Sequence, residues 1–261
     1  MLIDLTGKTA LVTGSTAGIG YATAAGFHAS GATVVINGRT EQRVQEAVDG
    51  LGGGDRIIGV TADVGSATGC KALLDAVPHV DILVNNAGLA VPQPVLEIPD
   101  AEWERLFAVN VMSGVRLSRS YLPGMLTLGW GRVVFVSSES ALNIPAEMVH
   151  YGVTKLAQLG VARGLAESIP GSGVTVNSVL PGPTLTPGLE GFMDEMISDE
   201  AGSVEEAGRL LIERVRPTSL LGRLATSEEV ANLIVYLCSA QASATTGASL
   251  RVDGGVVRAV A

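Results

Sequence analysis

The sequence has few of the residues that build disulfide frameworks and metal sites. Its 261 residues include two cysteines and three histidines. Neither cysteine stands in a CxxC pair or at the Cys/His spacing of a zinc site. We therefore expect no disulfide framework and no bound metal, and interpret the cysteines as buried thiols of a cytoplasmic protein. These scarce residues are Cys70, Cys238, His28, His79 and His150.

Long apolar runs and basic stretches are also missing. No run approaches the ~20 apolar residues that span a bilayer. No charged segment followed by an apolar one opens the chain, so we expect neither a membrane span nor a signal peptide. The net charge is −9 and no basic stripe is visible, which disfavours nucleic acid as a partner. A bound phosphate would have to be held by local donors.

What is present is an alternation of short apolar strands and helical patterns. Apolar residues make up 47% of the chain, enough for a sizeable core. The pattern predicts an α/β, Rossmann-type doubly wound sheet of seven mostly parallel strands with helices on both faces. We find no repeat or linker and expect one domain over 1–261. The expected strands cover 8–13, 32–36, part of 55–61, 80–84, 132–138, 174–180 and 248–252, and the main helices 41–51, 65–78, 103–125, 151–169 and 226–239.

A glycine-rich turn follows the first strand. Its glycines let the backbone approach a pyrophosphate, and the helix after it, which Gly31 ends, offers unpaired N–H groups and partial positive charge. The spacing is GxxxGxG, and a plain strand-to-helix turn is the alternative. The candidate cofactor residues here are Gly14, Ser15, Thr16, Gly18, Ile19 and Gly20.

The residues after the second predicted strand bear on which dinucleotide is bound. An acidic residue there would bind the ribose 2′-hydroxyl of NAD, but the chain reads Asn37-Gly38-Arg39-Thr40. Arg39 could pair with a 2′-phosphate, which favours NADP(H). NAD(H) stays possible if Arg39 only stacks on adenine. Asp63 and Val64 follow the third predicted strand, where they could contact adenine.

A hydroxyl, a phenol and an ammonium occur close together in the middle of the chain. Tyr151 and Lys155 stand four residues apart, which places them on one face of a helix. Ser138 lies thirteen residues before Tyr151, directly after a strand-like run. These three side chains could converge at the end of a strand. The alternative is a tyrosine that packs on a lysine stem.

Several of these signals occur together, in one order and at one spacing. They are TGSTAGIG (13–20), NNAG (85–88), Asn110, Ser138, YGVTK (151–155), the PG turn (181–182) and VDGG (252–255). Over essentially its whole length the chain resembles the short-chain dehydrogenase/reductase family, and within it the 3-oxoacyl-(acyl-carrier-protein) reductase-like carbonyl reductases. Position 17, often basic in NADP-using relatives, is alanine.

The resemblance implies site residues and an assembly. It implies a catalytic tetrad of Asn110, Ser138, Tyr151 and Lys155, with Ser137 as the rival for the serine role. It also implies a homotetramer in which helices 103–125 and 151–169 pair across subunits. Tyr151 and Lys155 would contact the cofactor too. The other cofactor positions it implies are Asn85, Ala87, Gly88, Pro181, Gly182, Thr184 and Thr186.

The implied chemistry is hydride transfer between a nicotinamide and a ketone or secondary alcohol. Tyr151 would act as general acid and base, and Ser138 would donate a hydrogen bond to the carbonyl oxygen. We expect the Lys155 ammonium to lower the pKa of Tyr151, against burial, which raises it. The resemblance further implies that Asn110 holds a water that relays protons from Lys155.

The substrate side is expected downstream. Ser138, Tyr151, Leu142 and Ile144 are the candidate substrate residues. A lid over about 187–219 would close an apolar pocket; the alternative is two surface helices with buried apolar faces. The lid's apolar residues are Leu189, Phe192, Met193, Met196, Ile197, Leu210 and Leu211.

Two acidic residues and two other functions stay open. Glu139 and Glu147 are expected to be solvated carboxylates, unless they meet a basic substrate. The alternative functions are an NAD-dependent hydroxysteroid or hydroxyacyl dehydrogenase and a non-catalytic dinucleotide-binding regulator.

Overall fold

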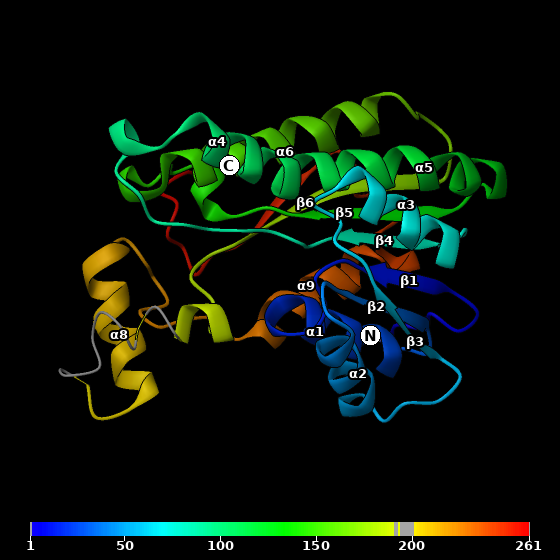
Figure 1. Ribbon diagram of the computed structural model, residues 1–261, viewed down its shortest axis with the longest axis horizontal. Helices are drawn as coiled ribbons and strands as arrows, with labels where there is room; N and C mark the ends of the chain where they lie inside the picture. Colours follow the sequence, from blue (N-terminus) through cyan, green and yellow to red (C-terminus); the bar gives the residue numbers. More distant parts are fainter. Residues whose placement is uncertain (1, 191–192, 194–200, 261) are drawn as a thin grey trace.

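The protein is built on one parallel sheet (Figure 1). The structure is a computed structural model that describes residues 2–190, 193 and 201–260. Within these residues seven strands lie in the order β3-β2-β1-β4-β5-β6-β7, and every neighbouring pair is parallel. This confirms the predicted doubly wound sheet. The strands are β1 (Thr9–Val12), β2 (Thr33–Gly38), β3 (Ile57–Thr61), β4 (Ile82–Asn85), β5 (Gly131–Val136), β6 (Val174–Pro181) and β7 (Ser249–Val252).

Helices cover both faces of the sheet, as Figure 1 shows. One apolar core joins the sheet to α1, α2 and α9, and a second joins the other face to α3, α5 and α6. Strands covered on both faces are apolar on both, as β1 and β4 are. The helices are α1 (Gly18–Ala29), α2 (Glu41–Gly50), α3 (Ala67–Ala76), α4 (Asp100–Phe107), α5 (Ser113–Leu128), α6 (Val149–Glu167), α8 (Val204–Val215) and α9 (Ser227–Leu237).

The strand order reverses between β1 and β4. From β1 the chain first builds outward through β2 and β3, then returns to place β4 on the other side of β1. In sheets of this kind ligands bind outside the carboxyl ends of the strands, at the point where the order reverses. The site is therefore expected beyond Val12 and Val84, which lie side by side.

The helix predicted over 103–125 is wrong as a single regular helix. It begins earlier, at Asp100, and ends later, at Leu128. Between α4 and α5 the segment Ala108–Met112 forms a π-helical turn. Such turns insert one extra residue into an α-helix, and this one contains Asn110.

The lid segment has a small apolar core of its own. Met193 packs with Leu211 and Ile212 of α8 and with Leu224. Leu189 and Leu210 are partly buried against this cluster. Figure 1 shows α8 at the left edge, away from the sheet. The predicted lid residues Phe192, Met196 and Ile197 lie outside the described residues.

Short 3-10 helices connect the main elements. The chain forms η1 (Val95–Glu97) before α4, and η3 (Glu139–Ala141) and η4 (Ala146–Met148) between β5 and α6. Another, η5 (Ala240–Ala242), follows α9. A capping box of Thr226 and Glu229 begins α9. In the described part of the chain no helix combines the length and the apolar character needed to cross a membrane.

Candidate active site

The glycine turn is packed so tightly that its glycines cannot carry side chains. Gly14 and Gly18 have φ values of 62° and 55°, which glycine adopts without strain. A Cβ on Gly14 would lie 3.1 Å from the Ala87 Cα, and one on Gly20 would lie 2.5 Å from the Asn86 Nδ2. The turn therefore presents bare backbone at the carboxyl end of β1.

Thr13 and Asn86 hold this turn in place, a role that the sequence motifs containing them did not reveal. The Thr13 hydroxyl accepts hydrogen bonds from the backbone N–H groups of Asn86 and Ala87, both at 3.0 Å. The Asn86 amide donates to the carbonyls of Thr13 and Gly14. The neighbouring Asn85 points elsewhere: it is buried and donates to Ser118 of α5. The NNAG pattern was the signal that could have found Asn86.

The amino end of α1 is available to an anion. Its N-cap, Ala17, makes no side-chain capping hydrogen bond, and its first turn contains no acidic residue. The first N–H groups of a helix lack partners within the helix and carry partial positive charge. The turn and the helix end together could therefore hold a pyrophosphate. Ile19, in this first helical turn, is partly buried against the core.

Asn37 and Gly38 are buried in the sheet, whereas Arg39, the next residue, is exposed. β2 extends past the expected strand, through Asn37 and Gly38, because Asn37 is held in the sheet interior. The Asn37 amide donates to two backbone carbonyls of the β3 region and accepts from the Gly14 N–H. A Cβ on Gly38 would lie 2.5 Å from the Thr16 methyl. Arg39 is exposed, directly after this contact, on the rim of the glycine turn.

Asp63 and Val64 lie in different environments. The Asp63 carboxylate is exposed and accepts a hydrogen bond from the Gly65 N–H at 3.0 Å. Val64 is buried in the core that α3 and α5 share. Of the two side chains, only that of Asp63 is accessible to an adenine ring.

The segment after β6 reaches the glycine turn. A Cβ on Gly18 would lie 3.1 Å from the Thr186 methyl. Gly182 packs on the backbone of Asp253, where a Cβ would lie 2.6 Å from a carbonyl oxygen. Thr184 is buried, and its hydroxyl donates to the Gly182 carbonyl. Of the candidates from Pro181 onward, Thr186 is therefore the side chain that meets the turn.

Two consecutive serines follow β5, and the structure gives them different tasks. The Ser137 hydroxyl donates to the Lys155 backbone carbonyl at 2.8 Å and is buried. The Ser138 hydroxyl accepts from the Ser140 N–H at 3.1 Å and acts as a hydrogen-bond partner of the Tyr151 phenol. This geometry favours Ser138 over its rival.

Lys155 is buried behind Tyr151. Its ammonium donates to the Val136 carbonyl at 2.9 Å and lies 5.6 Å from the centroid of the Tyr151 ring. Burial lowers the pKa of Lys155 to about 8, because the charged form loses hydration. Tyr151 itself is half-buried.

The expected lowering of the Tyr151 pKa is wrong for the protein alone. Burial, the largest cause, raises the pKa of the phenol, and the Ser138 hydroxyl lowers it by a smaller amount. The nearby Glu139 carboxylate raises it further, and Arg216 opposes that. Lys155 does not reverse this direction, although its ammonium lies 5.6 Å from the centroid of the Tyr151 ring. A phenol in this state is suited to donate a proton.

Asn110 is a structural clamp. Its amide oxygen accepts from the Leu89 N–H at 2.7 Å, and its amide nitrogen donates to the Leu89 carbonyl and the Thr154 hydroxyl. Its own carbonyl accepts from Gln158 at 2.6 Å. Both N–H groups of the side chain are thus engaged, so the side chain has no donor left for the expected water.

Gly88 lies against the side chains of Lys155 and Asn110. A Cβ there would lie 3.4 Å from the Lys155 Nζ and 3.5 Å from the Asn110 Oδ1. Its neighbour Ala87 touches the glycine turn. The structure therefore places the loop after β4 between the glycine turn and the side chains of Lys155 and Asn110.

The candidate substrate residues Leu142 and Ile144 lie at the surface, whereas the nearby Glu139 is buried. Leu142 and Ile144 are half-exposed, at 48% and 41%, and Leu142 lines an open depression with Thr218 and Val256. Glu139 is not a solvated carboxylate: it is 2% exposed and bonded to the Arg216 Nε at 2.8 Å.

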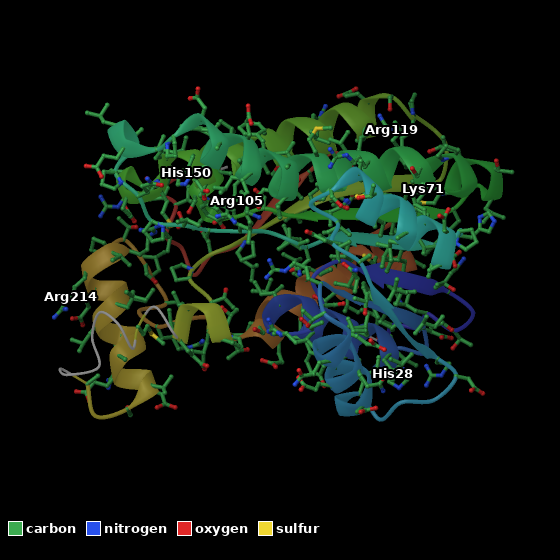
Figure 2. The ribbon with its side chains drawn as sticks, in the orientation of Figure 1. His28, Lys71, Arg105, Arg119, His150 and Arg214 are labelled. Carbon is green, nitrogen blue, oxygen red and sulfur yellow. The ribbon has the colours of Figure 1, made fainter. Side chains whose placement is uncertain are left out.

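His150 faces the helical layer, away from Tyr151's site. Figure 2 shows it beside α4, in the layer above the sheet. Its ring stands edge-on to Trp103 at 5.8 Å, and it is fully buried. Within the described residues no group of three or more His, Cys, Asp or Glu side chains is arranged to hold a metal.

Comparisons with known proteins agree with this geometry. The family model described as enoyl-(acyl carrier protein) reductase matches residues 14–257. The chain is 47% identical to an uncharacterized oxidoreductase, YvaG of Bacillus subtilis, and 33% identical to the D-beta-hydroxybutyrate dehydrogenase of Cupriavidus necator; the alignments cover at least 97% of every chain. The solved structure of L-sorbose reductase from Gluconobacter frateurii, complexed with NADPH and L-sorbose, superposes with a TM-score of 0.94 at 33% identity over 100% of both chains. The chain belongs to the short-chain dehydrogenase/reductase family and is an oxidoreductase of that family.

Proposed function

We propose that this oxidoreductase reduces a ketone to a secondary alcohol and runs the reverse reaction, with Tyr151 as the proton donor and acceptor. The observation that carries the proposal is the convergence of Ser138, Tyr151 and Lys155 at the end of β5, beside the close approach of Gly88. A nicotinamide dinucleotide, when bound, supplies or accepts the hydride.

The side chains divide the remaining work. As negative charge develops on the carbonyl oxygen, Tyr151 donates its proton and Ser138 a hydrogen bond. Lys155 keeps a positive charge behind the phenol, which stabilises the tyrosinate left after proton transfer. Asn110 positions the loop after β4 against α6 through Leu89 and Thr154. It is a positioning residue in this proposal.

The cofactor is proposed to be NADP(H). Arg39 stands exposed at the rim of the glycine turn, where its guanidinium could pair with a 2′-phosphate. In the L-sorbose reductase structure the bound cofactor is NADPH, which supports the proposal. Its dinucleotide would lie along Gly14 to Gly20, Asp63, Gly88 and Thr186.

We also propose the domain organisation, the assembly and the cellular location of the protein. The chain forms one domain whose segment 187–219 covers the substrate, with its own apolar core around Leu211. It assembles as a homotetramer through α4, α5 and α6, and acts in the cytoplasm on a small molecule.

The test is cofactor oxidation with a panel of ketones. The purified protein is given NADPH or NADH and, in turn, acetoacetyl thioesters, aryl ketones, steroids and ketoses. Faster turnover with NADPH supports the proposal. If the protein only oxidises hydroxyacyl or hydroxysteroid substrates with NAD, it is a dehydrogenase of that kind. If it binds the cofactor without any turnover, it is a non-catalytic regulator.

A further inference from the structure

A buried ion pair lies next to the proposed catalytic serine. Glu139, the residue after Ser138, is 2% exposed. One of its oxygens, Oε1, accepts from the Arg216 Nε at 2.8 Å and from the Ser140 hydroxyl at 3.2 Å. Arg216 follows α8, so the pair links the loop after β5 to the base of the segment proposed to cover the substrate.

The carboxylate side of the ion pair is left incomplete. The second carboxylate oxygen of Glu139, Oε2, is buried and has no hydrogen-bond partner within the described residues. Arg216 donates from Nη1 to the Val215 carbonyl and, at 3.4 Å, to Glu147. No hydrogen bond within the same part of the chain engages its Nη2. A buried carboxylate oxygen without a donor is costly, so this arrangement indicates a ligand.

The pair is close enough to the phenol to matter for the reaction. After burial and the Ser138 hydroxyl, the next largest influences on the Tyr151 pKa are the charges of Glu139, which raises it, and Arg216, which lowers it. Glu139 also directly follows Ser138, the proposed donor to the carbonyl oxygen, and it holds the Arg216 Nε at 2.8 Å, so the pair lies near the proposed reacting end of the substrate. A substrate bound at Tyr151 would place the part next to its carbonyl against this pair.

The Glu139 Oε2 can only accept a hydrogen bond and the Arg216 Nη2 can only donate one, and this restricts the substrate group that fits between them. A hydroxyl can donate to Oε2 and accept from Nη2 at the same time. An alkyl or acyl chain would leave both groups unpaired. A carboxylate could accept from Nη2 but would leave Oε2 without a donor and be repelled by Glu139, and an ammonium could donate to Oε2 but would leave Nη2 without an acceptor and be repelled by Arg216. Of these groups, a neutral hydroxyl is the one that completes the pair.

We propose that Glu139 and Arg216 form a subsite that binds a substrate hydroxyl beside the reacting carbon, and that the substrate is a polyhydroxylated ketone or the matching polyol. This inference rests on the proposed ketone reduction, whose substrate class it names. Glu139 is a specificity-determining residue in it.

The first experiment uses the unaltered protein. Values of kcat/KM are measured with NADPH and NADH for D-fructose, L-sorbose, their single-deoxy analogues and 2-hexanone, which has the same chain length and no hydroxyl. A ketohexose is expected to exceed 2-hexanone by at least about a hundredfold, because a site built for a hydroxyl rejects an analogue without one. One deoxy analogue, the one lacking the bound hydroxyl, should lose at least about tenfold.

The second experiment compares two matched variants. Glu139→Gln keeps the side-chain shape and removes the charge, and should lower the ratio of ketohexose to 2-hexanone kcat/KM by about tenfold or more, the usual worth of a hydrogen bond to a charged group. Glu147→Gln is the control. It removes the charge of Glu147, the half-exposed and more distant carboxylate partner of Arg216. The ratio of ketohexose to 2-hexanone kcat/KM should then stay within about twofold.

The outcomes separate this inference from the proposed function. Reduction of 2-hexanone as fast as the ketohexoses refutes the subsite and leaves ketone reduction intact. A Glu139→Gln variant that lowers both activities equally shows a structural role only, which also refutes it. If that variant does not fold, the deoxy series with the unaltered protein decides. Failure to reduce any ketone with either cofactor refutes the proposed function and the subsite together.

Discussion

The Lys155 ammonium donates a hydrogen bond to the Val136 carbonyl at 2.9 Å. A neutral carbonyl compensates a buried positive charge less well than a carboxylate would, and burial lowers the pKa of Lys155 to about 8. The protein therefore retains a buried charge at the candidate active site at the expense of its own stability.

Because burying the ammonium costs stability, Lys155→Met should increase the free energy of unfolding by an amount that depends on pH. The lysine pKa is near 8 when folded and near 10.5 when unfolded, so the unfolded state binds more protons between these values. The stability of the unaltered protein should then rise with pH across that window. At pH 7 the methionine variant should be more stable by about 1–3 kcal/mol, and the gap should close toward pH 10.5. Urea unfolding at several pH values measures it; a gap that does not change with pH would contradict the buried-ammonium account.

Tyr151→Phe tests the proposed acid. The change removes one hydroxyl and leaves the ring that packs beside Lys155. Turnover should fall by about a hundredfold to ten-thousandfold, the usual contribution of a general acid, while the Kd for NADPH stays nearly the same. Fluorescence titration of the cofactor provides the control. A fall of less than about tenfold would assign the proton to another group.

Arg39→Ala tests the choice of cofactor. Loss of a guanidinium that pairs with a 2′-phosphate should raise the KM for NADPH by about ten- to a hundredfold and leave that for NADH within about twofold. Arg43→Ala, an exposed arginine of α2, is the matched control. Equal effects of Arg39→Ala on the two cofactors would remove Arg39 as the reader of the phosphate.

Gly20→Ala tests the packing of the glycine turn. The added methyl would lie 2.6 Å from the Gly14 carbonyl and 2.5 Å from the Asn86 amide. Backbone must shift to make room, so we expect a loss of about 1–3 kcal/mol in the free energy of unfolding and weaker NADPH binding. In the control, Gly124→Ala, the methyl meets only His79, at 3.8 Å. That variant should be no less stable than the parent protein; similar losses in both would argue against the packing described.

The order of strands and helices was predictable because local patterns determine it. Alternating apolar runs and glycine turns predict a parallel sheet, and its strands fall within or beside the expected ranges. The π-helical turn around Asn110 was not predictable in this way. It depends on contacts of Asn110 with Leu89 and Thr154, which lie far apart in the sequence.

The same limit explains what sequence reasoning missed at the site. The tyrosine-lysine spacing places two side chains on one helical face, so their proximity could be predicted. The partners of Glu139 could not, because Arg216 lies 77 residues away. Nor could the direction of the Tyr151 pKa shift, which depends first on burial and then on Ser138, Glu139 and Arg216.

The π-helical turn from Ala108 to Met112 also sets how the two halves of one long helix face their neighbours. Removing its extra residue would join α4 and α5 into a regular helix. Every side chain of α4 would then rotate by about 100° relative to α5, and Trp103 would leave the ring of His150. A one-residue deletion here should therefore disturb more of the molecule than most substitutions nearby, so the length of this segment is as constrained as its composition.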